Sequence, residues 1–244
     1  MIRSYEPAGW RDYVMNWKGD PHPTMEDPGR EIQVVTGALK VLVQSGVLPG
    51  AEYDHERFLA HRRAVRDRFE IPWTGISPRM QRLIYAINAI ARPGIMVAAG
   101  VFCGNTFISN AGAAIGPGAC YEAERLVGIE IDVKEAERAA RNVRSIDPEG
   151  KAEIVAADAV EWIRDVNGSV DLLYIDANGS YLDIIRTAEA GHLRHGSIVL
   201  AHNSVNMADA IAPYLRFVRD PSNSRASINM CVDDQGLEVT LWGR

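Results

Sequence analysis

The sequence predicts an α/β protein built on a doubly wound, mostly parallel, seven-stranded sheet, with a small helical appendage at its N-terminus. Three observations predict this fold. From Ile95 onward, short apolar segments alternate with segments of helical periodicity; the first apolar segment runs into a glycine-containing turn; and the chain closes with two apolar segments around a turn. Such alternation is typical of parallel sheets that carry helices on both faces. We expect an appendage over residues 1–76 and the sheet domain over residues 77–244.

The composition is that of an ordinary globular protein. The chain has 244 residues, of which 47% are hydrophobic and 24% are charged, which suffices for one large domain with an appendage. The net charge of −6 argues against nucleic acid as the main partner. No segment has the apolar core of a signal peptide or approaches membrane-spanning length, so we expect a cytoplasmic protein without a membrane partner. Cys103, Cys120 and Cys231 show neither paired spacing nor a metal motif, and we expect free thiols.

The first thirty residues are expected to lack regular structure, because Pro21, Pro23 and Pro28 interrupt it. The segment is nevertheless too aromatic for a disordered tail. Its aromatic residues are Tyr5, Trp10, Tyr13 and Trp17. We expect them to pack on the sheet domain or on a partner subunit, and we expect a homo-oligomer, namely a dimer. The whole of residues 1–76 is therefore expected to form a lid over the substrate or a subunit interface.

Three helices are expected before the sheet. In order, they run from Glu31 to the stop at Leu48-Pro49-Gly50, from an Asp54 cap to Phe69, and from a Ser77 cap, with Pro78 at the first helical position, to Pro93-Gly94. The second helix carries four arginines on its outer face: Arg62, Arg63, Arg66 and Arg68. We interpret this face as solvated surface; binding of an acidic substrate is the alternative.

The first strand of the sheet and its turn form the central motif. Ile95–Ala99 is short and wholly apolar, as expected of a strand buried on both faces. Gly100 allows a sharp turn, Gly104 allows another molecule to approach the main chain, and Asn105 and Thr106 open a helix through residue 114. The spacing matches neither a dinucleotide fingerprint nor a phosphate loop. A strand, glycine loop and helix in this order are typical of nucleotide-like ligand sites, although many such turns bind nothing.

The remaining elements follow the same alternation. Strands are expected over residues 126–131, 153–156, 170–175 and 197–201, each followed by a helix, over residues 133–144, around Val160 and Ile163, over 182–190 and over 207–218. The segments 226–232 and 237–242 are expected to form an antiparallel hairpin around Asp233-Asp234-Gln235-Gly236. The hairpin would supply one reversed strand at the edge of the sheet.

Polar residues or glycines follow every parallel strand, at the rim where open α/β sheets bind ligands. They are Gly100 and Gly104 after the first strand, Glu130 after the second, Asp158 after the third, Asp176 after the fourth, and His202 with Asn203 after the fifth. Glu130 is suited to hold both hydroxyls of a ribose, and Asp158 to accept from an adenine amino group. Asp158 could instead be only the cap of the next helix, and His202 only a hydrogen-bonded core histidine.

Five short motifs carry a resemblance to a known family. They are Ala99-Gly100-Val101-Phe102-Cys103-Gly104-Asn105-Thr106, Gly128-Ile129-Glu130-Ile131-Asp132, Ala157-Asp158-Ala159, Tyr174-Ile175-Asp176-Ala177 and Ala201-His202-Asn203. With these motifs, the region from about Ser77 to Trp242 resembles class I S-adenosylmethionine-dependent methyltransferases, most closely the catechol and caffeoyl-CoA O-methyltransferases. The resemblance implies a small-molecule methyl acceptor and S-adenosyl-L-methionine as cofactor. It assigns cofactor binding to Gly100, Phe102, Gly104, Thr106, Glu130, Asp158, Ala159 and Asp176.

The chain departs from this family at several positions. Ala98 stands where the family usually carries an acid, and the gap between Gly100 and Glu130 is long. The family's magnesium ligands are Asp, Asp and Asn, whereas the corresponding set here is Asp176, His202 and Asn203. Magnesium prefers oxygen ligands and imidazole suits later transition metals, so whether a divalent metal binds is left open. The family's catalytic lysine has no counterpart in residues 178–181.

His202 is the leading candidate for a catalytic base, because imidazole titrates near neutral pH. Asp176 could orient the imidazole or bind the acceptor, while the N-terminal helices and the loop around Trp73 would close the acceptor pocket. Methylation of a hydroxyl oxygen on a small molecule is the leading function. Methylation of nitrogen or carbon without a metal, and a cofactor-binding protein of this fold without methyl transfer, remain alternatives.

Overall fold

The computed structural model describes residues 3–73 and 75–243. Within this part of the chain the strands form one eight-stranded sheet of order β1-β7-β8-β6-β5-β2-β3-β4. The strands are β1 (Ser4–Tyr5), β2 (Ile95–Ala99), β3 (Arg125–Glu130), β4 (Ala152–Ala156), β5 (Val170–Ile175), β6 (Leu193–His202), β7 (Ser224–Met230) and β8 (Leu237–Trp242). The expected doubly wound, mostly parallel sheet is confirmed.

The helices alternate with the strands of the main domain. They are α1 (Pro28–Gln44), α2 (His55–Arg68), α3 (Pro78–Ala91), α4 (Asn105–Ala111), α5 (Val133–Ile146), α6 (Ala159–Asp165), α7 (Tyr181–Glu189) and α8 (Ala212–Val218), with short 3₁₀ turns at Trp10–Asp12 and Gly116–Gly118. The expected caps of α2 and α3 are confirmed, because Asp54 accepts from Arg57 N and Ser77 from Met80 N. Pro28 does not interrupt structure; it occupies the first turn of α1, where its missing N–H costs nothing. None of the described helices is long and apolar enough to span a bilayer.

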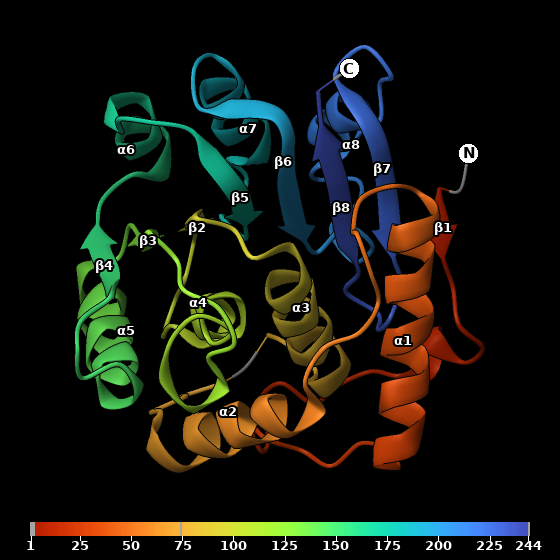
Figure 1. Ribbon diagram of the computed structural model, residues 1–244, viewed down its shortest axis with the longest axis vertical. Coiled ribbons are helices and arrows are strands. Elements are labelled where there is room, and N and C mark those ends of the chain that lie inside the picture. The colour runs from red at the N-terminus through yellow and green to blue at the C-terminus, as the bar shows by residue number, and fades with distance from the viewer. Residues whose placement is uncertain (1–2, 74, 244) are drawn as a thin grey trace.

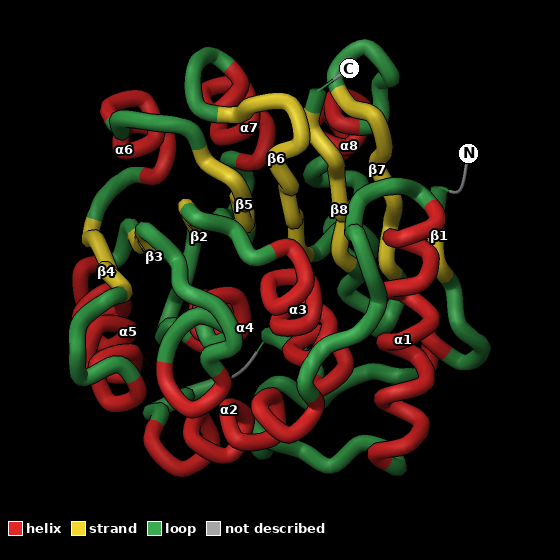
Figure 2. Tube along the Cα trace, in the orientation of Figure 1, coloured by secondary structure: helices red, strands yellow, loops and turns green. Residues whose placement is uncertain are grey.

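The sheet lies between two helical layers, which Figures 1 and 2 show on its opposite sides. Successive residues of a strand face opposite sides of a sheet, and the core divides accordingly. Met96 and Ala98 pack in the cluster that contains α1, α3, α4 and α5 residues, whereas Val97 and Ala99 pack in the cluster of α6, α7 and α8. Because both faces are covered, β2 at the centre of the sheet is apolar throughout.

Two features of the sheet differ from expectation. The reversed strand β8 does not lie at the edge; it pairs antiparallel with both β6 and β7 and therefore lies between them. β7 consequently runs parallel to β6, and its carboxyl end reaches the same rim. The eighth strand is β1, a two-residue segment of the N-terminal region that pairs parallel with β7. No hydrophobic periodicity marks so short a strand.

The N-terminal segment packs on the sheet domain (Figure 2). The Tyr5 hydroxyl donates to the carbonyl of Val34 in α1 over 2.9 Å. Trp10 and Tyr13 are buried, and the Arg79 guanidinium lies 3.7 Å from the centre of the Tyr13 ring. Trp17 remains 49% exposed. Most of the aromatic surface of this segment is therefore covered by the same chain.

A buried charge cluster joins the three N-terminal helices. Glu31 of α1 accepts hydrogen bonds from Arg62 of α2 and Arg82 of α3. The side chains of Glu31 and Arg82 are 8% and 2% exposed. The expectation that Arg62 belongs to a solvated face is therefore wrong, because its guanidinium turns inward to the carboxylate.

Candidate active site

A cavity of about 580 Å³ lies past the carboxyl ends of the parallel strands. It is lined by nearly all the site residues that the sequence predicts: Gly100, Phe102, Thr106, Glu130, Asp158, Ala159, Asp176, His202 and Asn203. Gly104 is the exception and does not line it. Residues distant in sequence meet here because β2, β3, β5 and β6 are parallel and end at one rim.

The two loop glycines are required by the protein's own packing. A Cβ atom on Gly100 would lie 2.3 Å from the carbonyl oxygen of Asp176, and one on Gly104 would lie 3.3 Å from Ala139 of α5. Both residues also have positive φ, of 80° and 89°. The expectation that Gly104 admits another molecule is therefore corrected: α5 occupies that space. Phe102, between them, also has a positive φ of 48°, an uncommon conformation for a non-glycine residue.

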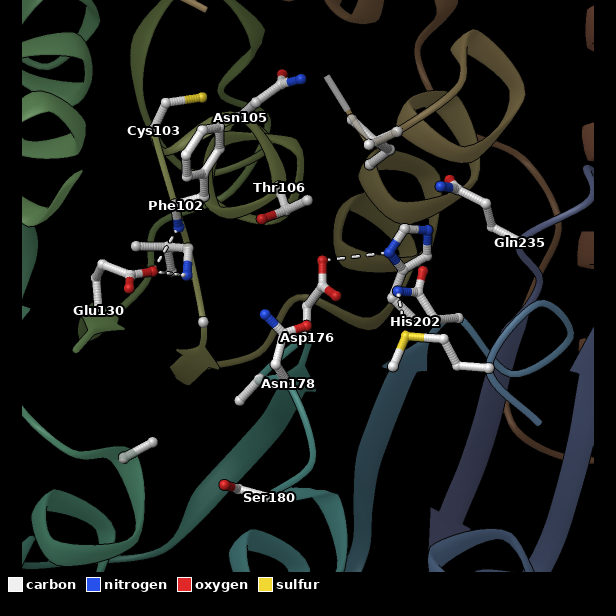
Figure 3. Close-up of a pocket in the computed structure, with 18 of the residues that line it drawn as sticks. Phe102, Cys103, Asn105, Thr106, Glu130, Asp176, Asn178, Ser180, His202 and Gln235 are labelled. Carbon is white, nitrogen blue, oxygen red and sulfur yellow. Dashed lines mark hydrogen bonds and ion pairs between the residues drawn. The ribbon is translucent and has the colours of Figure 1, made fainter. Parts of the chain in front are cut away.

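Glu130 holds the glycine loop in this conformation. Its Oε2 accepts from the backbone N–H groups of Phe102 over 2.7 Å and Val101 over 3.1 Å, as Figure 3 shows. Its Oε1 accepts from Asp132 N over 3.0 Å. A carboxylate offers about four acceptor sites, so three N–H donors leave acceptor capacity for a ligand hydroxyl. Glu130 thus connects the loop to the end of β3.

Asp158 is the N-cap of α6. Its Oδ1 accepts from the backbone N–H groups of Val160 and Glu161 over 2.8 and 3.0 Å. Oδ2 is not used in capping, and the residue lines the cavity. The capping role foreseen from sequence is therefore present, and it leaves one oxygen for a ligand. Beside it, Ile131 lines the cavity while 70% exposed.

Asp176 and His202 form a pair at the ends of β5 and β6 (Figure 3). Nδ1 of His202 lies 3.2 Å from Oδ2 of Asp176. The Asp176 backbone N–H donates to the Ala99 carbonyl, and the Tyr181 hydroxyl donates to the His202 carbonyl over 3.1 Å. The backbones of Asp176 and His202 are therefore both held by hydrogen bonds, which keeps the two side chains close to each other.

The electrostatics of His202 follow from its partner. The residue is only 2% exposed, and burial by itself lowers the pKa of an imidazole. The charge of Asp176 and its hydrogen bond outweigh burial, so that the pKa of His202 is raised above its ordinary 6.5. Nε2 is buried beside the Gln235 side chain, which also raises the pKa, and it makes no hydrogen bond of close geometry among the described residues. The ring therefore has Asp176 on one nitrogen and no close hydrogen bond on the other.

The metal set expected from the family resemblance does not fit a magnesium site. The described residues contain no group of three or more His, Cys, Asp or Glu side chains that could hold a metal. Asp176 and His202 contact each other directly, and the Asn203 amide nitrogen donates to the sulfur of Met207 over 3.3 Å. Asn203 also has a positive φ of 63°. We therefore derive no step through a metal.

Sequence reasoning missed the β7–β8 turn as part of the lining, whereas it expected the N-terminal residues to form a lid over the substrate or a subunit interface. The β7–β8 turn contributes Asp234 and Gln235, and the N-terminal segment contributes Val14, Met15 and Trp17. The turn is held by the neighbouring Asp233, which accepts from the Ser77 hydroxyl and from the backbone N–H groups of Gln235 and Gly236. The sequence did predict the hairpin turn, but the turn reaches the rim only because β7 runs parallel to β6.

Aromatic rings lie along the cavity wall. The ring centres of Trp17 and Trp73 are 5.6 Å apart at an interplanar angle of 69°, and those of Trp73 and Phe102 are 4.5 Å apart at 33°. Trp17 and Trp73 are 49% and 42% exposed. The chain of rings connects the N-terminal segment to the glycine loop. It offers edges and faces to a ligand ring.

Cys103 lines the cavity but is not suited to nucleophilic catalysis. Burial raises the pKa of its thiol to about 11, so the reactive thiolate is scarce at neutral pH. Cys103, Cys120 and Cys231 are all free, as expected from their spacing. This leaves His202 and the carboxylates as the proton-transfer groups of the site.

Comparisons with known proteins agree with this geometry. Residues 97–204 match the family model Methyltransf_24, described as a methyltransferase domain. Cofactor-bound Rv0187 from MTB is 21% identical, with a TM-score of 0.60 over 78% of this chain and 90% of the other. An O-methyltransferase from Bacillus cereus in complex with SAH is 14% identical, with a TM-score of 0.58 over 87% and 100%. None of the curated proteins compared matches the chain.

A further solved structure has the same fold. The O-methyltransferase TomG from Streptomyces achromogenes, involved in tomaymycin synthesis and solved in complex with SAM, is 18% identical, with a TM-score of 0.57 over 85% of this chain and 96% of the other. The matched family region contains the glycine loop and every rim residue from Glu130 to Asn203. Residues 97–204 thus match a methyltransferase domain, and the sheet that contains them has the fold of solved structures with bound SAM or SAH.

Proposed function

We propose that the chain methylates a hydroxyl oxygen of a small molecule, with His202 as a general base that works without a metal. One observation carries the proposal. The buried imidazole has Asp176 on Nδ1, while Nε2 makes no close hydrogen bond among the described residues. A hydroxyl acceptor must lose a proton as it is methylated, so a base that faces the acceptor is needed.

S-adenosylmethionine supplies an electrophilic methyl group on a sulfonium, and the residues at one end of the cavity suit it. A volume of about 580 Å³ is within the range of small-molecule sites. Glu130 has acceptor capacity for a ribose hydroxyl, Oδ2 of Asp158 is available to an adenine amino group, and exposed Ile131 offers apolar surface to the adenine ring. The backbone of the loop at Gly100 and Phe102 lines the same end.

The proton step uses the Asp176–His202 pair. Asp176 accepts a hydrogen bond from the Nδ1–H of His202 and so selects the tautomer with a lone pair on Nε2. As the acceptor oxygen displaces the neutral thioether sulfur from the methyl carbon, Nε2 takes the hydroxyl proton. The resulting imidazolium is stabilised by the carboxylate that it already contacts. Asp176 thus both orients the imidazole and stabilises its positive charge.

The N-terminal segment and the Trp73 loop are proposed to form the lid of the acceptor end. Val14, Met15 and Trp17 line the cavity beside Trp73. Their apolar surface would exclude water from the reacting atoms and position an acceptor ring. Two solved proteins of the same fold, from Bacillus cereus and Streptomyces achromogenes, are O-methyltransferases, which supports oxygen as the acceptor atom.

The test is transfer of an isotope-labelled methyl group from S-adenosylmethionine to a panel of phenols, amines and carbon acids, with the methylated atom located by mass spectrometry. We expect labelled methyl ethers. His202→Gln should abolish turnover while S-adenosylhomocysteine affinity is retained. His195→Gln is the matched control, because His195 is an exposed residue of the same strand. Label on nitrogen or carbon, or full activity of His202→Gln, would overturn the proposal.

A further inference from the structure

The carboxylates of the described cavity lining are not balanced by basic side chains. Four carboxylates line it, those of Glu130, Asp158, Asp176 and Asp234, and none of its described lining residues is Lys or Arg. An anionic acceptor would meet these charges without a fixed cation to pair with. Phosphorylated compounds and coenzyme A thioesters, which carry several phosphate charges, are therefore disfavoured as acceptors.

Three of the four carboxylates already have a role in the site. Glu130 binds the glycine loop, Asp158 caps α6, and Asp176 contacts His202. Asp234 has none of these. No ion pair joins it to a basic side chain within the described residues, in contrast to its buried neighbour Asp233, which accepts three hydrogen bonds. Asp234 is thus the carboxylate left to face a ligand.

Asp234 is also only partly exposed, although it lies in a turn. Burial, and after it the charge of Asp233, raise the pKa of the Asp234 carboxyl from its ordinary 3.8. A partly desolvated carboxylate gains more from an opposite charge than an exposed one does. The imidazolium form of His202 lowers the pKa of Asp234, but it is the smallest of the causes and is itself paired with Asp176.

The same cavity carries aromatic surface that suits an organic cation. Trp17 and Trp73 line the cavity with 49% and 42% of their surface exposed. Indole faces attract ammonium groups as well as aromatic rings. Gln235, next to Asp234 in the chain, lies beside His202 in Figure 3. The buried Nε2 of His202, which makes no close hydrogen bond within the described residues, therefore belongs to the same end of the cavity as Asp234.

We propose that the acceptor is a small aromatic compound that carries both the hydroxyl to be methylated and a cationic amine, and that Asp234 is the counterion of that amine. The inference rests on the proposed function and specifies its substrate class. The hydroxyl faces Nε2 of His202, the ring packs on Trp17 and Trp73, and the ammonium group pairs with Asp234.

The test uses three phenols of similar shape that differ in charge: tyramine, 4-ethylphenol and 3-(4-hydroxyphenyl)propanoate. Their binding to protein saturated with S-adenosylhomocysteine is measured by calorimetry. We expect tyramine to bind at least about tenfold tighter than 4-ethylphenol, the factor expected for one charge-assisted contact. The propanoate should bind most weakly.

Variants of Asp234 test the assignment of the counterion. Asp234→Asn should remove the preference for tyramine, and Asp234→Lys should transfer it to the propanoate. Asp183→Asn, which makes the same charge change at an exposed position of α7, should keep the wild-type order. S-adenosylhomocysteine affinity should be the same in all four proteins.

The outcomes separate the inference from the function on which it rests. Equal binding of tyramine and 4-ethylphenol, binding of none of the three, or an unchanged order in Asp234→Lys would overturn the inference while leaving the methyltransferase assignment intact. Loss of the tyramine preference in Asp183→Asn would also overturn it, because the effect would then be one of net charge. Absence of methyl transfer to any hydroxyl would instead refute the proposed function.

Discussion

Nδ1 of His202 and Oδ2 of Asp176 lie 3.2 Å apart because their strands are in register. β5 and β6 are parallel neighbours in which Ile175 pairs with Ala201. Asp176 follows Ile175 and His202 follows Ala201, and both strands end at the cavity. The pair is thus fixed by backbone hydrogen bonds, which is the condition for a base that must meet a substrate in one orientation.

The pH dependence of turnover should report this pair. As a general base, His202 acts when deprotonated, and Asp176 raises its pKa above 6.5. We therefore expect turnover to rise with pH through a midpoint above 6.5. Asp176→Asn removes the charge that raises the pKa, so the midpoint should move to lower pH while the maximal rate falls. Profiles of kcat measured from acid to mildly alkaline pH test this. An identical midpoint in Asp176→Asn would contradict the assignment.

Metal dependence gives an independent test of the same residues. If His202 is a base without a metal, a chelator should leave turnover unchanged, and His202→Asp should be inactive with or without magnesium. The competing interpretation makes Asp176, His202 and Asn203 metal ligands. It requires that a chelator abolish activity and that manganese, iron, cobalt, nickel or zinc restore it better than magnesium, because imidazole favours these ions. Activity measurements with each added ion decide between the two.

Gly100 should be important for stability as well as for the site. Gly100→Ala places a methyl group 2.3 Å from the carbonyl oxygen of Asp176 at a residue with φ of 80°. Steric overlap and backbone strain together should lower the free energy of unfolding by about 2–4 kcal/mol. Gly179→Ala is the control: its φ is 84°, yet no atom lies within 4 Å of its added methyl, so only strain of about 1–2 kcal/mol is expected. Urea unfolding of both variants measures the difference, and equal losses would show that the contact with Asp176 can relax.

Much of the fold could be predicted from local pattern. The strands Val170–Ile175 and Leu237–Trp242 begin and end where their apolar segments do. The rim residues were also predictable, because parallel strands must end together. Local signals were sometimes misread: α8 was expected from Met207 but begins at Ala212, since Pro213 is better suited to a first turn than to a helix interior.

The remaining features depend on contacts that no local pattern contains. The position of β8 between β6 and β7 is set by long-range pairing, and it decides that Asp234 and Gln235 reach the site. The two backbone hydrogen bonds that Glu130 accepts from Val101 and Phe102 depend on the positive φ of Phe102. The inward turn of Arg62 depends on Glu31, which lies far away in the sequence. Each of these features required the assembled structure.

The buried cluster of Glu31, Arg62 and Arg82 leads to a stability prediction. Burial alone would raise the pKa of Glu31, but the hydrogen bonds and charges of the two arginines outweigh it and hold the pKa below the ordinary 4.5. The stabilisation is therefore complete above about pH 4.5 and is lost as the pH falls through the lower pKa of the folded state.

Removal of the carboxylate leaves Arg82 buried without its charge partner. Glu31→Gln should therefore lower the free energy of unfolding by about 3–5 kcal/mol near neutral pH. Glu137→Gln, at an exposed position of α5, should have little effect. The loss should shrink in acid, where Glu31 of the unmodified protein is itself protonated. Denaturant unfolding of both variants at two pH values checks this, and a loss independent of pH would assign the cost to packing.

Trp17 tests whether the N-terminal segment is a lid or a subunit interface. Trp17 lines the cavity, contacts Trp73 edge-on and is half exposed. As part of a lid, Trp17→Ala should raise the KM for the acceptor severalfold and leave both S-adenosylhomocysteine affinity and the hydrodynamic size unchanged. As part of an interface, the same variant should reduce the hydrodynamic size. Lys18→Ala, the adjacent exposed residue, should change neither quantity. Steady-state kinetics and size-exclusion chromatography on the same preparations distinguish the two roles, because only a lid residue couples to acceptor binding without altering assembly.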